Sequence, residues 1–206
     1  MYARSNRISG DPEALGAGMA FVHDTVMPAV LQMDGCVGMS MLVDRDSGRC
    51  IVTTAWADME AMNGSAGGVQ SMRERAAEIF RGTVETAEWE IAVLHRMRET
   101  GDGACARVTW TQGDPAGLDR MLDAFGMTMI PKLEELPGFC SVSMMVDRQS
   151  GRGATSVTYE SRAAMAAAQD RNTAMREEFL RSMGREATEG ADFDVVLAHL
   201  RVPETV

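Results

Sequence analysis

The stretches SMLVDRDSGR (residues 40–49) and SMMVDRQSGR (residues 143–152) differ at two of their ten positions and lie 103 residues apart. Each reads as a short apolar strand that ends in a turn containing Asp, Ser and Gly, a pattern typical of a β-hairpin. Near-identity of two such hairpins within one chain indicates an internal duplication.

The offset of 103 residues extends far beyond the hairpin. It aligns Gly10-Asp11-Pro12 with Gly113-Asp114-Pro115, Gly35 with Gly138, Met72-Arg73-Glu74 with Met175-Arg176-Glu177 and, after one inserted residue, WEIAVLH (89–95) with FDVVLAH (193–199). Two copies are too few, and their period is too long, for a solenoid. We therefore predict two units, residues 1–101 and residues 102–206.

Each copy predicts the same order of elements. In the first copy we expect strands over residues 2–8, 37–44, 51–56 and 84–96, and helices over residues 12–31 and 58–80. Asp11 and Pro12 supply an N-cap and a proline at the first helical position. The order β-α-β-β-α-β is that of a ferredoxin-like unit, whose sheet carries helices on one face and needs a cover for the other.

The composition argues against several classes of partner. The 206 residues carry a formal net charge of −10, which disfavours nucleic acids and anionic membranes, because phosphate binding needs a basic face. We find neither an apolar run of about 18 residues, as a transmembrane helix requires, nor an apolar signal segment, and we expect a cytoplasmic protein. The four cysteines form no CxxC pair, so we expect reduced thiols, and we predict no metal and no cofactor.

Two segments carry a family resemblance. In PGFCSVSMMVDR (137–148) a Pro-Gly-Phe precedes a strand, and in TTAWADMEAM (53–62) a Trp ends a strand before an acidic helix start. They resemble the dimeric α/β barrel superfamily and, within it, antibiotic biosynthesis monooxygenase (ABM)-like domains, here duplicated in tandem. The resemblance implies an α+β fold in which two tandem ferredoxin-like (βαββαβ) units pack sheet to sheet as an intrachain dimeric α/β barrel.

The resemblance also implies a range of activities. Some members resemble cofactor-free oxygenases of polycyclic aromatic compounds, others degrade haem, and substrates lie in a cleft between the sheet and the helices. The haem-degrading members use an Asn on the first strand, and a Trp and an iron-ligating His on the second helix. Asn6 matches the first of these, but residues 57–80 and 160–183 contain no His. We therefore do not expect haem chemistry.

The second helix differs between the copies, and this difference favours the first copy as the site. We expect Asn63-Gly64-Ser65 and Gly67-Gly68 to break the helix, since each helical glycine costs about 1 kcal/mol. The equivalent segment of the second copy holds good helix formers. A broken helix over the cleft predicts a flexible mouth, with Asn63 as a substrate contact.

Four further residues complete the candidate site. Asn6 is a candidate to donate a hydrogen bond to a developing oxyanion, and His23, a helical histidine without a counterpart in the second copy, is a candidate base. Trp56 and its counterpart Tyr159 are candidates to stack on an aromatic substrate. Each residue also has a structural interpretation as a polar strand residue, a solvated helix residue or a core aromatic.

Three functions remain open at this point. The first is a cofactor-independent monooxygenase of a small apolar aromatic compound, in which the substrate's own carbanion activates oxygen. The alternatives are a non-catalytic binding protein for a hydrophobic metabolite, and a stress-response or scaffold barrel without a ligand. The expected partner is a small molecule, and the intrachain pseudo-dimer leaves room for a further homo-oligomer.

Overall fold

The computed structural model describes residues 1–200. The first copy forms β1 (Tyr2–Ser9), η1 (Pro12–Ala14), α1 (Leu15–Phe21), η2 (Val22–Val26), α2 (Met27–Leu31), β2 (Cys36–Asp44), β3 (Arg49–Trp56), α3 (Met59–Gly64), α4 (Ala66–Ile79) and β4 (Thr83–Arg96). The second copy forms β5 (Cys105–Gln112), η3 (Pro115–Gly117), α5 (Leu118–Ala124), η4 (Phe125–Met129), α6 (Ile130–Glu134), β6 (Phe139–Asp147), β7 (Arg152–Tyr159), α7 (Arg162–Ser182) and β8 (Glu186–Leu200). The predicted second unit runs to residue 206, and its residues 201–206 lie outside the described part of the chain.

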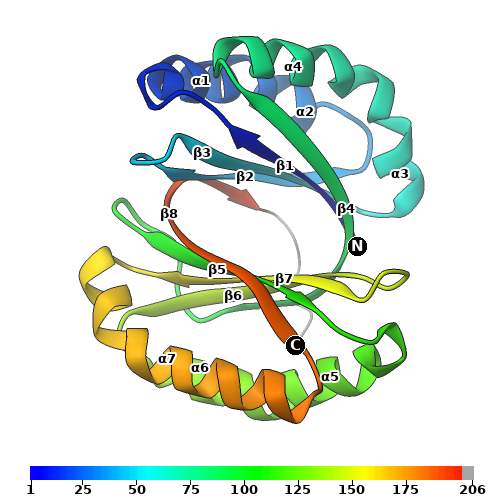
Figure 1. Ribbon diagram of the computed structural model, residues 1–206. Helices are drawn as coiled ribbons and strands as arrows, with labels where there is room; N and C mark the ends of the chain where they lie inside the picture. The colour runs from blue at the N-terminus through cyan, green and yellow to red at the C-terminus, as the bar shows by residue number, and fades with distance from the viewer. Residues whose placement is uncertain (201–206) are drawn as a thin grey trace. The chain divides into compact units, whose positions relative to one another are not determined.

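The strands form a closed barrel in the hydrogen-bonded order β1-β3-β2-β8-β5-β7-β6-β4 (Figure 1). Within the first copy β3 pairs antiparallel with both β1 and β2, and within the second copy β7 pairs antiparallel with both β5 and β6. This is the split arrangement of a ferredoxin-like unit. The predicted α+β fold class, a tandem pair of such units forming an intrachain dimeric α/β barrel, is confirmed.

The described chain divides into two compact units that exchange strand ends. Of the described residues, unit 1 comprises Met1–Trp89 and residues 194–200, and unit 2 comprises Glu90–Phe193. The second part of β4, from Glu90, therefore lies in unit 2, where it pairs antiparallel with β6. The last part of β8, from Asp194, pairs in the same way with β2 in unit 1. The predicted boundary at residue 101 refers to the sequence copies and stays a prediction.

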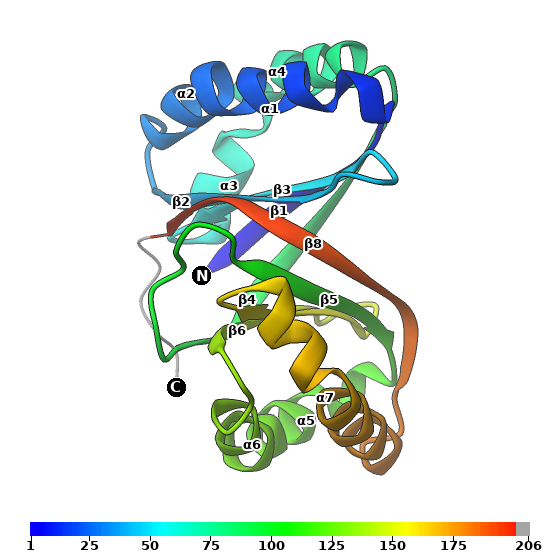
Figure 2. The same cartoon turned by 90° about the vertical axis from the view of Figure 1, so that its left-hand side faces the viewer.

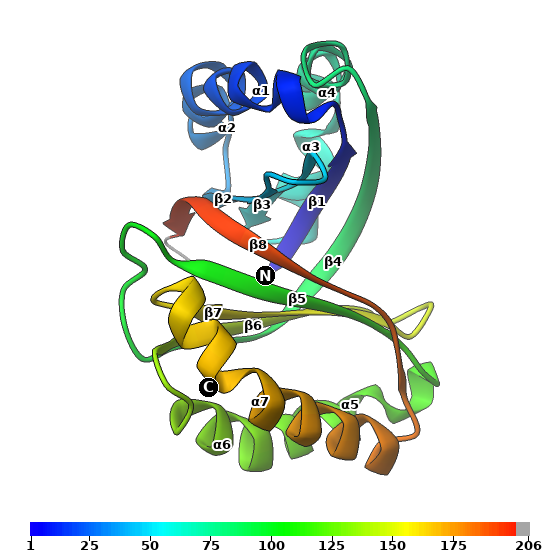
Figure 3. The ribbon, with the colours of Figure 1, turned by 60° about the vertical axis from the view of Figure 1, so that its left-hand side comes forward.

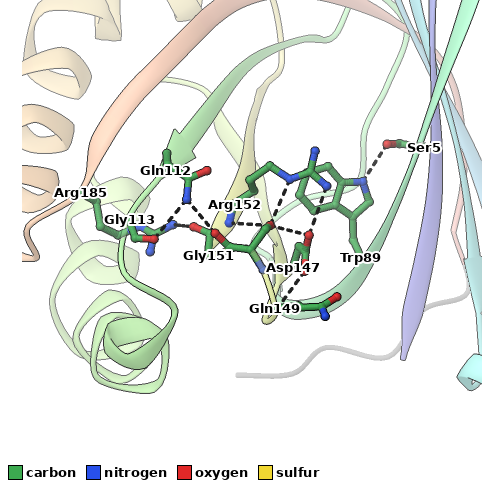
Figure 4. A network of polar contacts seen from close by, with 10 residues as sticks. Ser5, Trp89, Gln112, Gly113, Asp147, Gln149, Gly151, Arg152 and Arg185 are labelled. Atoms are coloured by element: carbon green, nitrogen blue, oxygen red, sulfur yellow. Dashed lines mark hydrogen bonds and ion pairs between the residues drawn. The ribbon is translucent and has the colours of Figure 1, made fainter.

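The aspartate of the repeated hairpin closes its turn. Asp147 accepts hydrogen bonds from the backbone N–H groups of Gln149 and Ser150, at 3.0 and 3.2 Å (Figure 4). Hydrogen bonds from Ser150, against a smaller opposing effect of burial, lower the pKa of Asp147 to about 2. Asp44 accepts the equivalent bonds in unit 1. The side chain of each aspartate thus replaces a backbone acceptor within a tight turn.

The arginine that follows this aspartate fastens the exchanged strand. Arg148 donates to both carboxylate oxygens of Glu90 on β4, at 2.6 and 3.0 Å. In unit 1, Arg45 donates to Asp194 on β8 at 3.1 Å. The sequence Val-Asp-Arg therefore recurs because each hairpin closes the same turn and binds the strand end that it receives from the other copy.

The helices of each unit cover one face of its strands. In unit 1, α1, α2 and α4 lie over β1, β2 and β3 (Figure 2). In unit 2, α5, α6 and α7 lie over β5, β6 and β7 (Figure 3). Buried apolar side chains between the layers include Leu15, Val22, Met39 and Phe80 in one cluster of unit 1, Val30, Trp56 and Met62 in another, and Leu118, Phe125, Leu133, Phe139 and Phe179 in unit 2.

The first long helix of each copy contains a π-helical turn. The turn η2 directly precedes the segment with Pro28, and η4 directly precedes the segment with Pro131. A proline within a helix lacks the N–H donor, and its ring clashes with the carbonyl four residues earlier. The wider π turn relieves both effects. The π turn rotates the helix face. A regular helical period therefore predicts the wrong buried and exposed positions for the residues that follow it.

The segment Pro12–Leu31 is long and apolar enough to cross a membrane by length and composition alone. This is weak evidence, because the core helix of a soluble protein passes the same test. Leu15, Val22 and Val30 of this segment are buried in the apolar clusters of unit 1.

Candidate functional site

Each unit contains a cleft between its helices and its sheet. The cleft of unit 2 encloses about 610 Å³ of space not filled by atoms, part of it open to solvent, and that of unit 1 about 490 Å³. The offset of 103 residues relates the linings: Arg4 to Arg107, Asn6 to Thr109, Ile8 to Thr111, Val22 to Phe125, Val69 to Asn172 and Arg73 to Arg176. The duplication has therefore kept a cleft at the same place in each copy and changed its chemistry.

The cleft of unit 1 is largely apolar, and its polar lining residues are Arg4, Asn6, Thr54 and Arg73. Its apolar lining includes Ile8, Val22, Val26, Val30, Val52 and Val84. The hydroxyl of Thr86 donates to Oδ1 of Asn6 at 2.9 Å and accepts from Nη1 of Arg73 at 3.4 Å. Because Thr86 engages the amide oxygen of Asn6, the amide nitrogen is the group placed to donate to a ligand.

The cleft of unit 2 combines an apolar wall with three arginines. The wall includes Met121, Phe125, Met129, Leu133 and Phe179, and the arginines are Arg107, Arg176 and Arg185. Among the described residues that line it there is no Asp, Glu or His. The lining is therefore cationic as well as apolar.

The arginine on the first strand of each copy is mainly structural. Arg107 donates from Nε and Nη2 to the two carboxylate oxygens of Asp192, at 2.6 and 2.9 Å, and hydrogen bonding to Asp192 raises the pKa of Arg107. Arg4 donates from Nε and Nη2 to Oε1 of Glu88, at 3.0 and 2.8 Å. Both arginines thus tie the first strand of their copy to its last strand.

The other two arginines of unit 2 have buried N–H groups without an acceptor. Arg185 is 7% exposed, and its Nη2 donates to the carbonyl of Gly151 at 2.6 Å (Figure 4). The same nitrogen donates to the hydroxyl of Thr111 at 3.5 Å. Nε and Nη1 of Arg185, and Nε of Arg176, have no hydrogen-bond partner in the described part of the chain. Burial lowers the pKa of both guanidinium groups, and Arg107 lowers that of Arg176 further.

Two of the predicted site residues line cavities, in different units. Asn6 lines the cleft of unit 1. Tyr159 lines a second cavity of unit 2, together with Arg162 and Gln169. The hydroxyl of Tyr159 accepts a hydrogen bond from Nδ2 of Asn172 at 2.7 Å, and burial, against smaller opposing effects that include this bond, raises the pKa of Tyr159 to about 12. The phenol therefore stays neutral and acts as a buried polar contact.

The other predicted site residues lie outside the two clefts. Trp56 is completely buried, and its Nε1 donates to the hydroxyl of Thr54 at 3.1 Å. Asn63 and His23 are exposed, and Nδ1 of His23 lies 2.7 Å from a carboxylate oxygen of Asp24. The structure thus gives Trp56 a place in the core. It does not bring His23 together with Asn6, and a role for His23 as a base stays a prediction without support from its position.

The break expected in the second helix of the first copy is present but short. Helix α3 ends at Gly64 and α4 begins at Ala66, whereas α7 is continuous. The carbonyl of Met62 accepts from the hydroxyl of Ser65 at 2.7 Å and from Nη2 of Arg4 at 2.9 Å, and these side-chain bonds compete with the helical ladder. Gly67 and Gly68 lie inside α4, so the break expected at these two glycines is wrong.

Sequence reasoning missed Arg185, although the chain carries a signal for it. The offset aligns Phe80-Arg81-Gly82 with Met183-Gly184-Arg185, so that the arginine and the glycine exchange places between the copies. The exchanged order predicts a buried arginine only if it is known that position 185, and not position 184, faces the interior of the protein.

The helix ends show why this exchange matters. Gly184 has a φ of 63° directly after α7, and the N–H of Arg185 donates to the carbonyl of Leu180 at 2.9 Å, which is a Schellman motif. In unit 1, Arg81 occupies the left-handed position with a φ of 51°, and Gly82 follows it. The residue after the left-handed position turns inward, so unit 2 buries an arginine where unit 1 has a glycine.

None of the four cysteines forms a disulfide. Burial raises the pKa of the thiols of Cys36 and Cys140, and that of Cys50 to about 12, so these three thiols are not activated. Within residues 1–200, no group of three or more His, Cys, Asp or Glu is placed to hold a metal ion.

Comparison with known proteins identifies relatives over the whole chain. No family model matches it. It is 45% identical to the uncharacterized protein Rv2557 of Mycobacterium tuberculosis H37Rv, over 100% of this chain and 92% of the relative, and 46% identical to the uncharacterized protein Rv2558 of the same strain, over 100% and 88%.

Solved structures share its fold. An anthrone oxidase-like protein aligns with a TM-score of 0.68 at 18% identity, covering 96% of this chain and 92% of the other. A ferredoxin-fold protein from Listeria monocytogenes, described as related to antibiotic biosynthesis monooxygenases, aligns with a TM-score of 0.55 at 8% identity, covering 96% and 97%.

Proposed function

The chain belongs to the family of the mycobacterial proteins Rv2557 and Rv2558 and has an ABM-like fold duplicated in tandem, and on this premise we propose that it is a cofactor-independent monooxygenase of a small apolar aromatic compound. The observation that carries the proposal is the largely apolar cleft of unit 1, in which the amide of Asn6 is hydrogen-bonded to Thr86. The likeness to an anthrone oxidase-like protein supports the same class of substrate. We propose that the protein acts in the cytoplasm.

The chemistry requires a substrate with an acidic C–H group conjugated to a carbonyl, as in an anthrone. Loss of the proton gives a carbanion whose charge rests largely on the carbonyl oxygen, and a donated hydrogen bond stabilises that oxyanion. The carbanion gives electrons to O₂ and forms a peroxide at the same carbon. Loss of water then leaves a carbonyl, so that one CH₂ group and one O₂ give one C=O group and one H₂O. The substrate itself supplies all the electrons.

The residues of unit 1 provide two parts of this process. The apolar lining holds the ring system and excludes water, which strengthens each polar interaction within the cleft. The amide nitrogen of Asn6 is the donor for the oxyanion, and Thr86 and Arg73 hold the orientation of that amide.

A second candidate function is binding without turnover. Neither cleft has an Asp, Glu or His among its described lining residues, so no side chain there is an obvious base for the C–H proton. This observation favours a protein that sequesters the same class of compound. An oxygenase would need a substrate that is acidic enough to lose its proton to water.

Oxygen uptake with an anthrone separates these functions. For the oxygenase we expect turnover by the wild type, and we expect Asn6→Ala to lower kcat by about a hundredfold, as does the loss of one oxyanion donor, while the anthrone still stabilises the protein in a thermal shift assay. Gln70→Ala, at an exposed position on α4 of the same unit, is the control and should keep full activity.

Two results would redirect the interpretation. Binding of the anthrone without oxygen uptake would favour the binding protein. Unchanged turnover in Asn6→Ala would remove the proposed role of Asn6.

A further inference from the structure

We propose that the cleft of unit 2 is a binding site for an organic anion, a compound with an apolar body and a carboxylate group that Arg185 holds. This site is separate from the Asn6 cleft of unit 1, and the inference stands whether or not unit 1 is catalytic.

The unsatisfied donors of Arg185 are the first observation. The residue is more than nine-tenths buried, and two of its guanidinium nitrogen atoms, Nε and Nη1, are buried without an acceptor in the described part of the chain. Buried polar groups in proteins are nearly always hydrogen-bonded, and an unpaired buried charge is strongly unfavourable. Nε–H points to the same edge of the guanidinium as Nη2, which is bound to Gly151, whereas Nη1 lies on the opposite edge. A carboxylate oxygen in the cleft would accept from one of these two donors and compensate the buried charge.

The backbone fixes Arg185 in this position. The Schellman motif after α7 holds its N–H on Leu180, and its Nη2 is anchored on the carbonyl of Gly151. Its side chain also packs on Gly113, where an added Cβ would lie 2.7 Å from Cγ of Arg185. The guanidinium is therefore preorganised, and binding of a carboxylate would cost little side-chain entropy.

The rest of the lining selects an apolar anion. Nε of Arg176 in the same cleft also has no acceptor, whereas the charge of Arg107 is matched by Asp192. The described lining contains no acid to neutralise Arg176 and Arg185. The apolar part of the wall consists of Met and Phe side chains with Leu133, Leu180 and Val157, which favour a flat or flexible apolar body. The polar part consists of Thr109, Thr111, Thr155 and Asn172.

The same position in unit 1 excludes such a site. Gly82 stands where unit 2 has Arg185, and a Cβ on Gly82 would lie 2.0 Å from the backbone carbonyl oxygen of Ser9. The nearby arginine of unit 1, Arg81, is exposed and pairs with Asp11. The Arg185 donors are therefore specific to the second copy, whereas the buried Nε without an acceptor recurs in both copies, at Arg73 and Arg176.

A matched pair of fluorescent probes tests the proposal on the full-length wild-type protein. Anthracenecarboxylate and anthracenemethanol share a ring system and differ in charge. We expect the wild type to bind the carboxylate at least about tenfold more tightly than the alcohol, because charge-assisted hydrogen bonds to a buried guanidinium exceed neutral ones. Arg185→Met should remove this preference and leave the affinity for the alcohol unchanged, and Arg185→Lys should restore part of it.

Arg81→Met is the matched control, since it removes the aligned but exposed arginine of unit 1, and it should keep the preference. Equal affinity of the wild type for both probes, no saturable binding of the carboxylate, or an unchanged preference in Arg185→Met would overturn the proposal. If thermal melting shows that Arg185→Met is unfolded, Arg176→Met replaces it and should weaken carboxylate binding. The test measures binding and not turnover. If the wild type prefers the carboxylate but consumes no oxygen, the oxygenase proposal fails and the anion site remains.

Discussion

Replacing Arg81 by glycine is expected to stabilise the protein. Arg81 has a φ of 51°, a conformation that costs an L-residue roughly 1–2 kcal/mol. The substitution also removes an ion pair with Asp11 at 3.2 Å, in which the arginine side chain is 67% exposed, and such a pair contributes about 0.2–1 kcal/mol. The difference leaves a net increase of about 1 kcal/mol in the free energy of unfolding.

Urea denaturation followed by circular dichroism measures this change. Arg81→Ala separates the two contributions, because alanine loses the ion pair but keeps the strained backbone, and it should be less stable than wild type by up to about 1 kcal/mol. The reverse experiment is Gly184→Ala in unit 2. An added Cβ there meets no atom within 4 Å, so its expected loss of roughly 1–2 kcal/mol comes from the backbone alone.

The difference in stability between Arg81→Gly and Arg81→Ala shows whether the left-handed backbone at position 81 is strained. If both variants have the same stability, the left-handed residue stores no strain, and the explanation of the exchanged Arg-Gly order at the two helix ends is wrong. A neutral Gly184→Ala would lead to the same conclusion from the other copy.

Two further predictions concern buried and turn-forming polar groups of unit 2. Tyr159→Phe removes the acceptor of Nδ2 of Asn172, a side chain that is 6% exposed, and the unsatisfied amide should lower the free energy of unfolding by about 1–3 kcal/mol in urea titrations; stability equal to that of wild type would contradict this. The pKa of Asp147 is lowered from 3.8 to about 2 by hydrogen bonds in the folded hairpin, so its contribution to stability is complete above pH 3.8 and is lost as the pH falls towards 2. Thermal melting over this pH range should therefore show a smaller acid-induced loss of stability for Asp147→Asn than for wild type, and parallel curves would show that the turn aspartate does not contribute.

The fold could be predicted from the sequence because of the duplication. The two copies of the hairpin gave the length of the repeated unit and allowed the order of its strands and helices to be compared between the copies. The position of Asn6 on the first strand followed from the predicted order of elements, and the structure places Asn6 in the lining of the unit 1 cleft. Its role in the site stays a prediction. The position of His23 did not follow in this way, because the π turn η2 contains it and rotates the helix face away from a regular period.

Arg185 escaped prediction for a different physical reason. Its burial depends on which of two adjacent residues takes the left-handed position after α7, and sequence periodicity does not report this. The predicted break in the second helix favoured the first copy as the site, but this break spans little more than Ser65. The buried charge of Arg185, which has unsatisfied donors, lies in the second copy.

The exchange of strand ends through β4 and β8 has a consequence for how such a chain evolves. A separate pair of subunits must find each other at cellular concentrations and, if encoded by one gene, must change together. Here the partner strand is always present at an effective concentration of about millimolar, as for any short covalent tether. Each copy must therefore still supply its last strand to the other unit. The residues that line its cleft are not needed for this assembly. A mutation that abolishes one ligand site leaves the assembly intact, so the two pockets are free to specialise.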